Sequence, residues 1–268
     1  MALIMPILAN LIFFLALTTA APLSCTSPHN PIILLHGMSS NASSLSALSS
    51  YLIIHNYCVY ALTYGAKPSA PSVGGLLPIA RSSAQIASFI HDVHAKSHAR
   101  KIDLIGHSEG AFQALYTAKF GNFSHLLEHI IATAPATHGT NLNGVYGRAY
   151  VMGEVSREIL GVMLQLTGNP VLDELGPDGP AVKKLNEGPI AQKGNKVTVI
   201  ASKTDGVVTP PVMSFMREEG VANMFVQVYC PGSKVKHEDE GLDENCWNSI
   251  LNSLQDRVGR KFKCSGKY

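Results

Sequence analysis

Charged residues are scarce in this chain, and they leave almost no net charge. Lys, Arg, Asp and Glu together make up 15% of the 268 residues, and the formal net charge is +2. No run of five or more basic residues occurs, so we expect no nucleic-acid partner. Hydrophobic residues make up 46% of the sequence, which excludes a disordered chain and favours one well-buried core.

The sequence also lacks an apolar run long enough to span a membrane. The run near the N-terminus covers residues 7–17, whereas a spanning helix needs about 20 residues. Small residues follow it, and Thr18 and Ala20 suit a signal-peptidase cleavage site. We therefore predict a signal peptide over residues 1–20, a mature domain over residues 21–268, and secretion into the extracellular space. An uncleaved anchor is the alternative.

Short β-rich runs alternate with helical patterns along the mature chain. This alternation predicts an α/β fold with a mostly parallel sheet flanked by helices, in which functional side chains gather at the carboxyl ends of the strands. One long segment, residues 139–196, interrupts the alternation and is interpreted as a lid-like insertion or, alternatively, a plain structural excursion. The predicted strands are residues 32–35, 58–62, 102–105, 130–134, 197–201 and 225–229, and the predicted helices are residues 44–54, 79–93, 111–120, 150–166, 181–185 and 245–258.

A G-x-S-x-G motif, Gly106-His107-Ser108-Glu109-Gly110, lies between a predicted strand and a predicted helix. This strand–turn–helix setting is the one in which such a serine projects into a cleft as a nucleophile. The two glycines are explained by steric crowding in the tight turn. We predict that Ser108 is the nucleophile.

A serine hydroxyl needs a histidine base held by a carboxylate, and with this type of turn the three residues follow in the order Ser, Asp or Glu, His. Of the histidines after Ser108, only His237 follows a strand that comes after a strand-end acid. Asp205 lies just past the preceding strand, in a loop. We therefore predict Asp205 and His237 as acid and base. The rejected candidates are His125, His129 and His138 for the base, and Asp173, Asp178, Asp239 and Asp243 for the acid.

Two backbone N–H groups are expected to bind the oxyanion formed during catalysis. One belongs to Glu109, the residue after the nucleophile, and the other to the small loop after the first strand. We predict Met38 for the second donor, with Gly37 as the alternative.

The residues around these positions resemble the class-2 lipases, which are secreted triacylglycerol lipases of the α/β-hydrolase fold. The resemblance rests on PIILLHGM at 31–38, IDLIGHSEGAFQALYTAKF at 102–120, IIATAPATHGT at 130–140, TDGVVTP at 204–210 and the stretch from Cys230 to His237. It implies hydrolysis of acylglycerol esters without a cofactor, and it places the catalytic residues at Ser108, Asp205 and His237. At Glu109-Gly110-Ala111 the family more often has an uncharged residue and two glycines.

This interpretation has consequences for partners. We expect a lipid or ester substrate, contact with a lipid–water interface, no metal site and a monomer. The alternatives are an acyltransferase or another serine esterase on a non-glyceride substrate and, further away, a lipid-binding protein without catalysis.

Secretion makes the five cysteines candidates for disulfides. Cys25 and Cys58 precede or open neighbouring parallel strands and are predicted to pair. Cys230 and Cys246 flank the His237 loop and are also predicted to pair, although Cys264 is an alternative partner for either of them.

Two N-x-S sequons predict glycosylation. They begin at Asn41 and Asn122.

Overall fold

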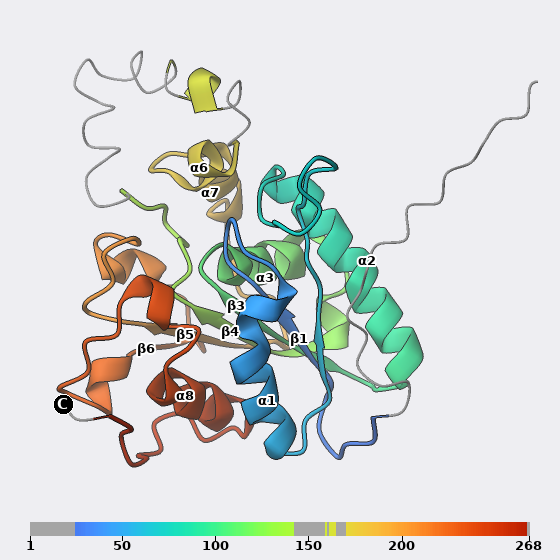
Figure 1. Ribbon diagram of the computed structural model, residues 1–268, viewed down its shortest axis with the longest axis vertical. Helices are drawn as coiled ribbons and strands as arrows, with labels where there is room; N and C mark the ends of the chain where they lie inside the picture. Colours follow the sequence, from blue (N-terminus) through green and yellow to red (C-terminus); the bar gives the residue numbers. More distant parts are fainter. Residues whose placement is uncertain (1–24, 142–158, 160, 165–169, 267–268) are drawn as a thin grey trace, which may run out of the picture.

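A single parallel sheet forms the centre of the computed structural model, which describes residues 25–141, 159, 161–164 and 170–266. Its six strands lie in the order β2-β1-β3-β4-β5-β6, and every neighbouring pair is parallel (Figure 1). The predicted α/β fold is therefore confirmed. The strands are β1 Ile32–Leu35, β2 Val59–Ala61, β3 Ile102–His107, β4 Leu127–Thr133, β5 Lys196–Ala201 and β6 Ala222–Phe225.

Alternate residues of the strands fill two separate hydrophobic cores. Ile33 and Leu35 of β1 pack with the helices of one face, and Ile32 and Leu34 pack with those of the other. All four side chains are buried, because a strand that is covered on both faces reads as a continuous apolar run. The helices of the first face are α2 Ile79–Ser97, α3 Glu109–Phe120, α6 Pro170–Leu175 and α7 Pro180–Leu185, and those of the second are α1 Ser46–Ile54 and α8 Glu244–Leu254.

Helix α2 shows how the sequence sets the helix bounds. Its buried positions include Ile79, Ile86, Ile90 and Val93, which recur at helical spacing on one face. The helix continues four residues beyond the predicted end and stops at His98, which adopts the left-handed conformation with φ 53°. Such a residue commonly terminates a helix.

The sixth strand lies three residues earlier than predicted. The alternation in FVQVY predicts a strand over residues 225–229, but β6 ends at Phe225 and residues Val226–Val228 form a 3₁₀ turn. Gln227 explains the change, because its buried amide oxygen accepts the N–H of Lys203 at 3.0 Å and its amide nitrogen donates to Ser202 Oγ at 2.8 Å. These side-chain bonds fasten the turn to the end of β5.

The insertion between β4 and β5 contributes the short helices α6 and α7 to the described structure, besides helical residues at 159 and 161–164. Helix α6 was not predicted, whereas α7 matches the predicted helix at residues 181–185. Of the predicted helix at residues 150–166, only residues 159 and 161–164 are described. Whether the insertion is a mobile lid stays a prediction, as does the signal peptide, which lies outside the described residues. In the described part of the chain, no helix combines the length and apolarity that a membrane span requires.

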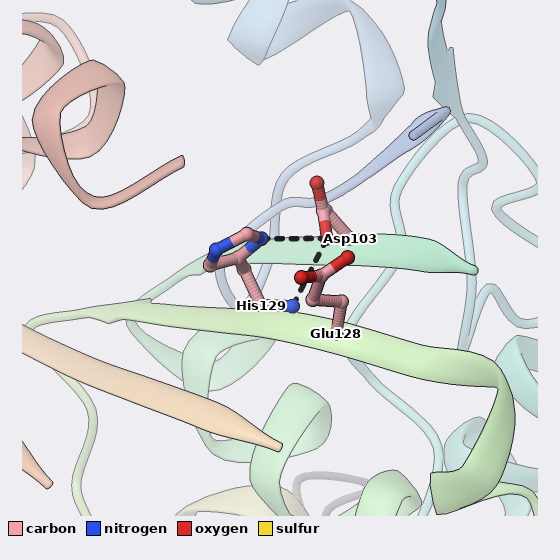
Figure 2. Close-up of side chains that lie close together, drawn as sticks. All are labelled: Asp103, Glu128 and His129. Atoms are coloured by element: carbon pink, nitrogen blue, oxygen red, sulfur yellow. Dashed lines mark hydrogen bonds and ion pairs between the residues drawn. The ribbon is translucent and has the colours of Figure 1, made fainter. Parts of the chain in front are cut away.

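A polar network joins the amino ends of β3, β4 and β5. One residue of β3, Asp103, lies opposite two of β4, Glu128 and His129, so a bulge leaves the N–H of His129 without a ladder partner. Asp103 Oδ1 accepts that N–H at 2.9 Å and lies 3.0 Å from the ring Nδ1 of the same histidine (Figure 2). The buried carboxylate therefore replaces the missing backbone acceptor.

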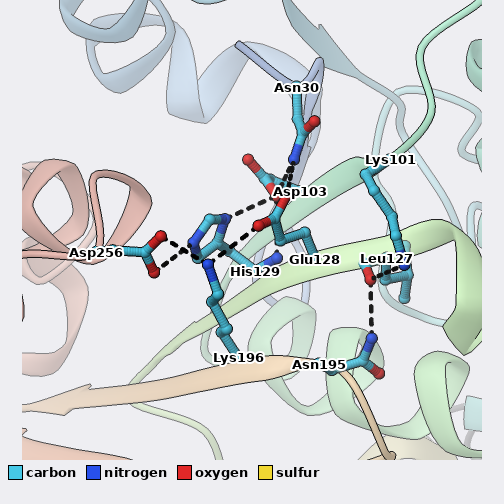
Figure 3. Close-up of polar contacts among 9 residues, drawn as sticks. All are labelled: Asn30, Lys101, Asp103, Leu127, Glu128, His129, Asn195, Lys196 and Asp256. Atoms are coloured by element: carbon cyan, nitrogen blue, oxygen red, sulfur yellow. Dashed lines mark hydrogen bonds and ion pairs between the residues drawn. The ribbon is translucent and has the colours of Figure 1, made fainter.

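The network extends outward from Asp103 to charged side chains (Figure 3). His129 Nε2 lies 3.2 Å from Asp256 Oδ1, and Lys196 contacts Asp256 at 2.6 Å and Glu128 at 3.0 Å. Burial alone would lower the pKa of His129, but hydrogen bonds to Asp103 and Asp256 and their charges outweigh it and raise the pKa. This network lies at the opposite edge of the sheet from Ser108, as expected for the rejected His129.

Candidate active site

The loop between β3 and α3 holds Ser108 in a conformation that few residues adopt. Ser108 has φ 56° and ψ −121°, in the region that costs a non-glycine residue strain energy. The flanking glycines allow this turn, because a Cβ at Gly106 would collide with the carbonyl of Gly110. A Cβ at Gly110 would collide with the carbonyl of Leu35. The turn therefore projects Ser108 at the carboxyl edge of the sheet.

The three residues predicted to form a triad lie within hydrogen-bond distance of one another. His237 Nε2 is 2.8 Å from Ser108 Oγ, and His237 Nδ1 is 2.8 Å from Asp205 Oδ2. Asp205 Oδ1 accepts the N–H groups of Val207 at 2.7 Å and Val208 at 3.0 Å. Two backbone donors and one ring donor therefore fix the carboxylate, and the carboxylate orients the imidazole.

The loop of His237 is held by a hydrogen bond from His107, the residue before the nucleophile. His107 Nε2 lies 2.8 Å from the carbonyl oxygen of His237, and the two rings are 5.2 Å apart. Burial lowers the pKa of His107 to about 4, so its ring is neutral at pH 7. Since a carbonyl only accepts, Nε2 carries the hydrogen and donates it. The sequence motif gave no sign of this contact.

His138, His129 and Asp243, which are rival candidates for the base or the acid, make contacts elsewhere in the structure. His138 Nε2 lies 2.9 Å from the carbonyl of Phe215, and His129 belongs to the network at the opposite edge. Asp243 caps helix α8 by accepting the N–H groups of Asn245 and Cys246. Asp205 is the carboxylate bonded to His237.

A pocket opens beside Ser108 and is lined mainly by apolar side chains. Helix α6 of the insertion supplies one wall, and the loop after Asp205 supplies another. The loop after β1 adds Met38 to the lining of the same pocket. The lining residues are Met38, Ser108, Glu109, Ala136, Thr140, Val171, Leu172, Leu175, Val207 and Val208.

The two predicted oxyanion-binding residues thus share a pocket with Ser108. The neighbouring Gly37 closely approaches the nucleophile, because a Cβ at Gly37 would lie 3.3 Å from Ser108 Cβ. This is the arrangement expected of an oxyanion loop, and the roles of the Met38 and Glu109 N–H groups stay predictions.

The side chain of Glu109 is buried beneath the site, which the sequence did not indicate. Its Oε1 accepts Gln113 Nε2 at 3.2 Å, and Gly75 leaves room for Oε2, where a Cβ would collide with it. Burial raises the pKa of Glu109 to about 8, although hydrogen bonding to Gln113 and Tyr64 opposes the shift. The residue therefore contributes a neutral carboxylic acid below that pH rather than a charge.

A second carboxyl group, that of Glu240, was also missed. It is fully buried, and one of its oxygens lies within 4.8 Å of a carboxyl oxygen of Asp205 and a ring nitrogen of His237. On sequence grounds Glu240 belongs to the charged run HEDEGLDE, which is typical of a solvated loop. Only the fold reveals that the side chain turns inward.

One predicted disulfide is confirmed and the other is wrong. Cys25 pairs with Cys58, with 5.8 Å between their Cα atoms. Cys230 pairs with Cys264 rather than Cys246, which is a buried free thiol. Cys246 faces inward from the first turn of α8 and packs with buried valines. The C-terminal segment instead returns to Cys230, with the ring of Phe262 against that of Tyr229.

The strand order and the serine-bearing turn define the α/β-hydrolase class. The chain belongs to the class 2 lipase family, because the family model described as lipase (class 2) matches residues 29–241.

Solved structures with the same fold include lipase B from Aspergillus fumigatus, which is 19% identical over 86% of this chain and 53% of its own, with a TM-score of 0.67. The propeptide form of lipase BlEst2 from Bacillus licheniformis is 12% identical over 92% of this chain and 53% of its own, with a TM-score of 0.64. A monoacylglycerol lipase from Paleococcus ferrophilus is 18% identical over 86% of this chain and 97% of its own, with a TM-score of 0.52. The chain thus spans about half the length of the first two.

Proposed function

We propose that this protein is a secreted serine hydrolase that cleaves carboxylic esters of lipids. The observation that carries the proposal is the pair of 2.8 Å contacts that link Ser108 to His237 and His237 to Asp205. Membership of the class 2 lipase family supports ester hydrolysis. The mechanism is complete within one chain, and we expect a monomer.

In the first half-reaction His237 Nε2 takes the proton of Ser108 as Oγ attacks the ester carbonyl carbon. The resulting imidazolium keeps its Nδ1–H on Asp205, whose charge stabilises it. The Met38 and Glu109 N–H groups bind the oxyanion, and each such donor is worth about 10²- to 10³-fold in rate. The imidazolium then protonates the leaving alcohol, and an acyl-enzyme remains on Ser108.

In the second half-reaction water replaces the alcohol. His237 removes a proton from the water, whose oxygen attacks the acyl carbon. The same N–H groups bind the second oxyanion. When the tetrahedral intermediate collapses, the proton returns from His237 to Ser108 Oγ and the fatty acid leaves.

The apolar pocket supports an acyl chain as the group held next to Ser108. Val171, Leu172 and Leu175 of helix α6 face it together with Val207 and Val208. These walls offer an acyl chain contact without buried charge. Because α6 belongs to the insertion at residues 139–196, we infer that this segment serves as a substrate wall that contacts the lipid–water interface.

Secretion is supported by the apolar leader and by two disulfides, which persist in oxidising compartments. We infer cleavage after residue 20 and a hydrolase domain over residues 21–268. Of the two sequons, Asn122 is exposed, whereas Asn41 is partly buried and its Nδ2 donates to the carbonyl of Ser72 at 3.1 Å. Asn122 is therefore the more accessible glycan acceptor.

The experiment that tests the proposal is the Ser108→Ala variant. We expect its kcat on p-nitrophenyl esters to fall by about 10⁴-fold or more, since the nucleophile is lost while the oxyanion site remains. Circular dichroism should be unchanged, because alanine removes only the hydroxyl. A phosphonate that forms a covalent adduct with serine should label the unsubstituted protein at Ser108 alone. Full activity in the variant, or labelling elsewhere, would refute the assignment.

A further inference from the structure

The proposed mechanism gives no role to the buried side chain of Glu240. Glu240 follows directly after the 3₁₀ turn that carries His237 and is 0% exposed. One of its carboxyl oxygens lies within 4.8 Å of both Asp205 and His237. A buried carboxyl group this close to a second carboxylate needs a physical explanation, because two neighbouring charges of the same sign disfavour each other.

The surroundings of Glu240 disfavour a negative charge, because burial and the charges of Asp205 and Asp243 outweigh the stabilising effect of the Ser202 N–H. Among the described residues, neither of its oxygens has a hydrogen bond of ordinary length and angle, although the Asp205 carboxyl and the Ser202 backbone N–H lie close enough to influence it. The groups that face it are Asp205 after β5, His237 on its own turn, and Asp243 and the Cys246 thiol at the start of α8. Burial, followed by the charge of Asp205, raises the pKa of Glu240 well above its usual range.

Asp205 has an acceptor position to spare. An ionised carboxylate offers about four lone-pair positions. Three are taken by the N–H groups of Val207 and Val208 and by His237 Nδ1. A protonated carboxylic acid has one O–H donor, so a protonated Glu240 can donate a hydrogen bond to the remaining acceptor position of Asp205.

We propose that Glu240 is a positioning residue of the active site, one that keeps its proton and donates it as a hydrogen bond to the Asp205 carboxylate. The inference rests on the proposed function, because it assigns Glu240 a task in the same triad. The proton stays on Glu240 throughout the reaction, so the group neither gains nor loses charge.

This arrangement has a chemical effect on the base. A hydrogen bond from Glu240 to Asp205 fixes the carboxylate facing His237 and spreads part of its negative charge away from the imidazole. His237 is then oriented by Asp205 without being locked in its protonated form. The free imidazole needed to accept the Ser108 proton stays available at lower pH.

The test compares two variants of similar side-chain volume, Glu240→Gln and Glu240→Met. Glutamine keeps a neutral donor, so we expect kcat/KM on p-nitrophenyl butyrate to stay within about threefold of the unsubstituted protein at every pH. Methionine removes the donor, so the full charge of Asp205 acts on His237. We expect the acidic limb of the kcat/KM profile of Glu240→Met to shift to higher pH by about half a unit or more. This shift lowers kcat/KM at pH 6 by about threefold or more. KM should stay unchanged, since Glu240 does not line the pocket.

Each alternative gives a different result. If Glu240 were ionised, Glu240→Gln would remove a negative charge near His237 and move the acidic limb down. If the residue only filled space, Glu240→Met would leave the acidic limb of the kcat/KM profile at the same pH. The concentration of active sites, titrated with the phosphonate, corrects kcat/KM for any misfolded protein. Either outcome overturns the proposal.

A second measurement holds even if the methionine variant does not fold. At pH 7 the infrared spectrum of the unsubstituted protein should contain the carbonyl stretch of a protonated carboxylic acid that disappears in Glu240→Gln, with Glu109→Gln as the matched control for the other buried acid. Persistence of that band in Glu240→Gln would refute a protonated Glu240. The band does not depend on turnover, so failure of the proposed hydrolase activity would show separately, in the Ser108→Ala experiment.

Discussion

The Cys230–Cys264 bridge closes a loop that contains His237, Glu240 and all of helix α8, so its removal should affect both stability and catalysis. The bridge spans 34 residues of sequence. The loop-closure entropy of a ring of that size corresponds to about 4 kcal/mol at 25 °C. We therefore expect Cys264→Ser to lower the free energy of unfolding by about that amount.

Urea denaturation measures this loss directly. For a denaturant slope of about 2.5 kcal/mol per molar, the midpoint should fall by about 1.5 M. The Cys25–Cys58 bridge spans 33 residues and lies away from the His237 loop, so Cys25→Ser is a matched control for ring size. We expect both variants to lose similar stability and only Cys264→Ser to lose kcat/KM at low urea.

The free thiol supplies the decisive comparison. Cys246 is buried and unbridged, so Cys246→Ala should cost only about 1 kcal/mol, as for other small truncations in a core. A loss of several kcal/mol in Cys246→Ala, with a negligible loss in Cys264→Ser, would show that Cys230 pairs with Cys246 and would refute our account of this loop.

Two further predictions concern pH. Because the pKa of Glu109 is raised to about 8 in the folded protein, the folded state keeps a proton that the unfolded state loses, and stability should fall between about pH 4.5 and 8. Glu109→Gln should remove this dependence and raise the free energy of unfolding at pH 8, measured by urea denaturation, by up to about 5 kcal/mol. A lower free energy of unfolding in the variant at pH 8 would mean that the carboxylate is ionised. His129 has a raised pKa, so its stabilising effect should be complete below about pH 6 and lost as the pH rises through its folded pKa, at about 1.4 kcal/mol per unit of elevation. His129→Gln should therefore lower the melting temperature more at pH 5.5 than at pH 8.5, and an equal loss at both would count against the charged pair with Asp103.

Local patterns in the sequence were sufficient to predict the fold. Residues 102, 104 and 105 are apolar because β3 is covered on both faces, and the glycines at 106 and 110 are required by close backbone approach. The order Ser108, Asp205, His237 led to the three side chains that the structure brings together. These features are visible because each depends on neighbours close in sequence or on the fixed polarity of parallel strands.

The sequence-based predictions are wrong or incomplete where contacts between residues far apart in the sequence determine the structure. The alternation at residues 225–229 favours a strand, yet Gln227 bonds to the end of β5 and turns the chain. Cys246 and Cys264 are equally plausible partners on spacing alone, and only the path of the C-terminal segment separates them. Glu240 lies in a charged run, and its burial follows from how that loop packs beneath Asp205.

The amino and carboxyl ends of the strands differ in the contacts that they make. At the amino edge, Asp103, His129, Lys196 and Asp256 fasten three strands together with ionic contacts. At the carboxyl edge, loops and helix α6 surround Ser108 without belonging to that fastening. Substitutions in α6 that widen or narrow the pocket beside Ser108 should therefore leave the ionic network at the amino edge intact, which makes this short helix a suitable place to redesign the pocket.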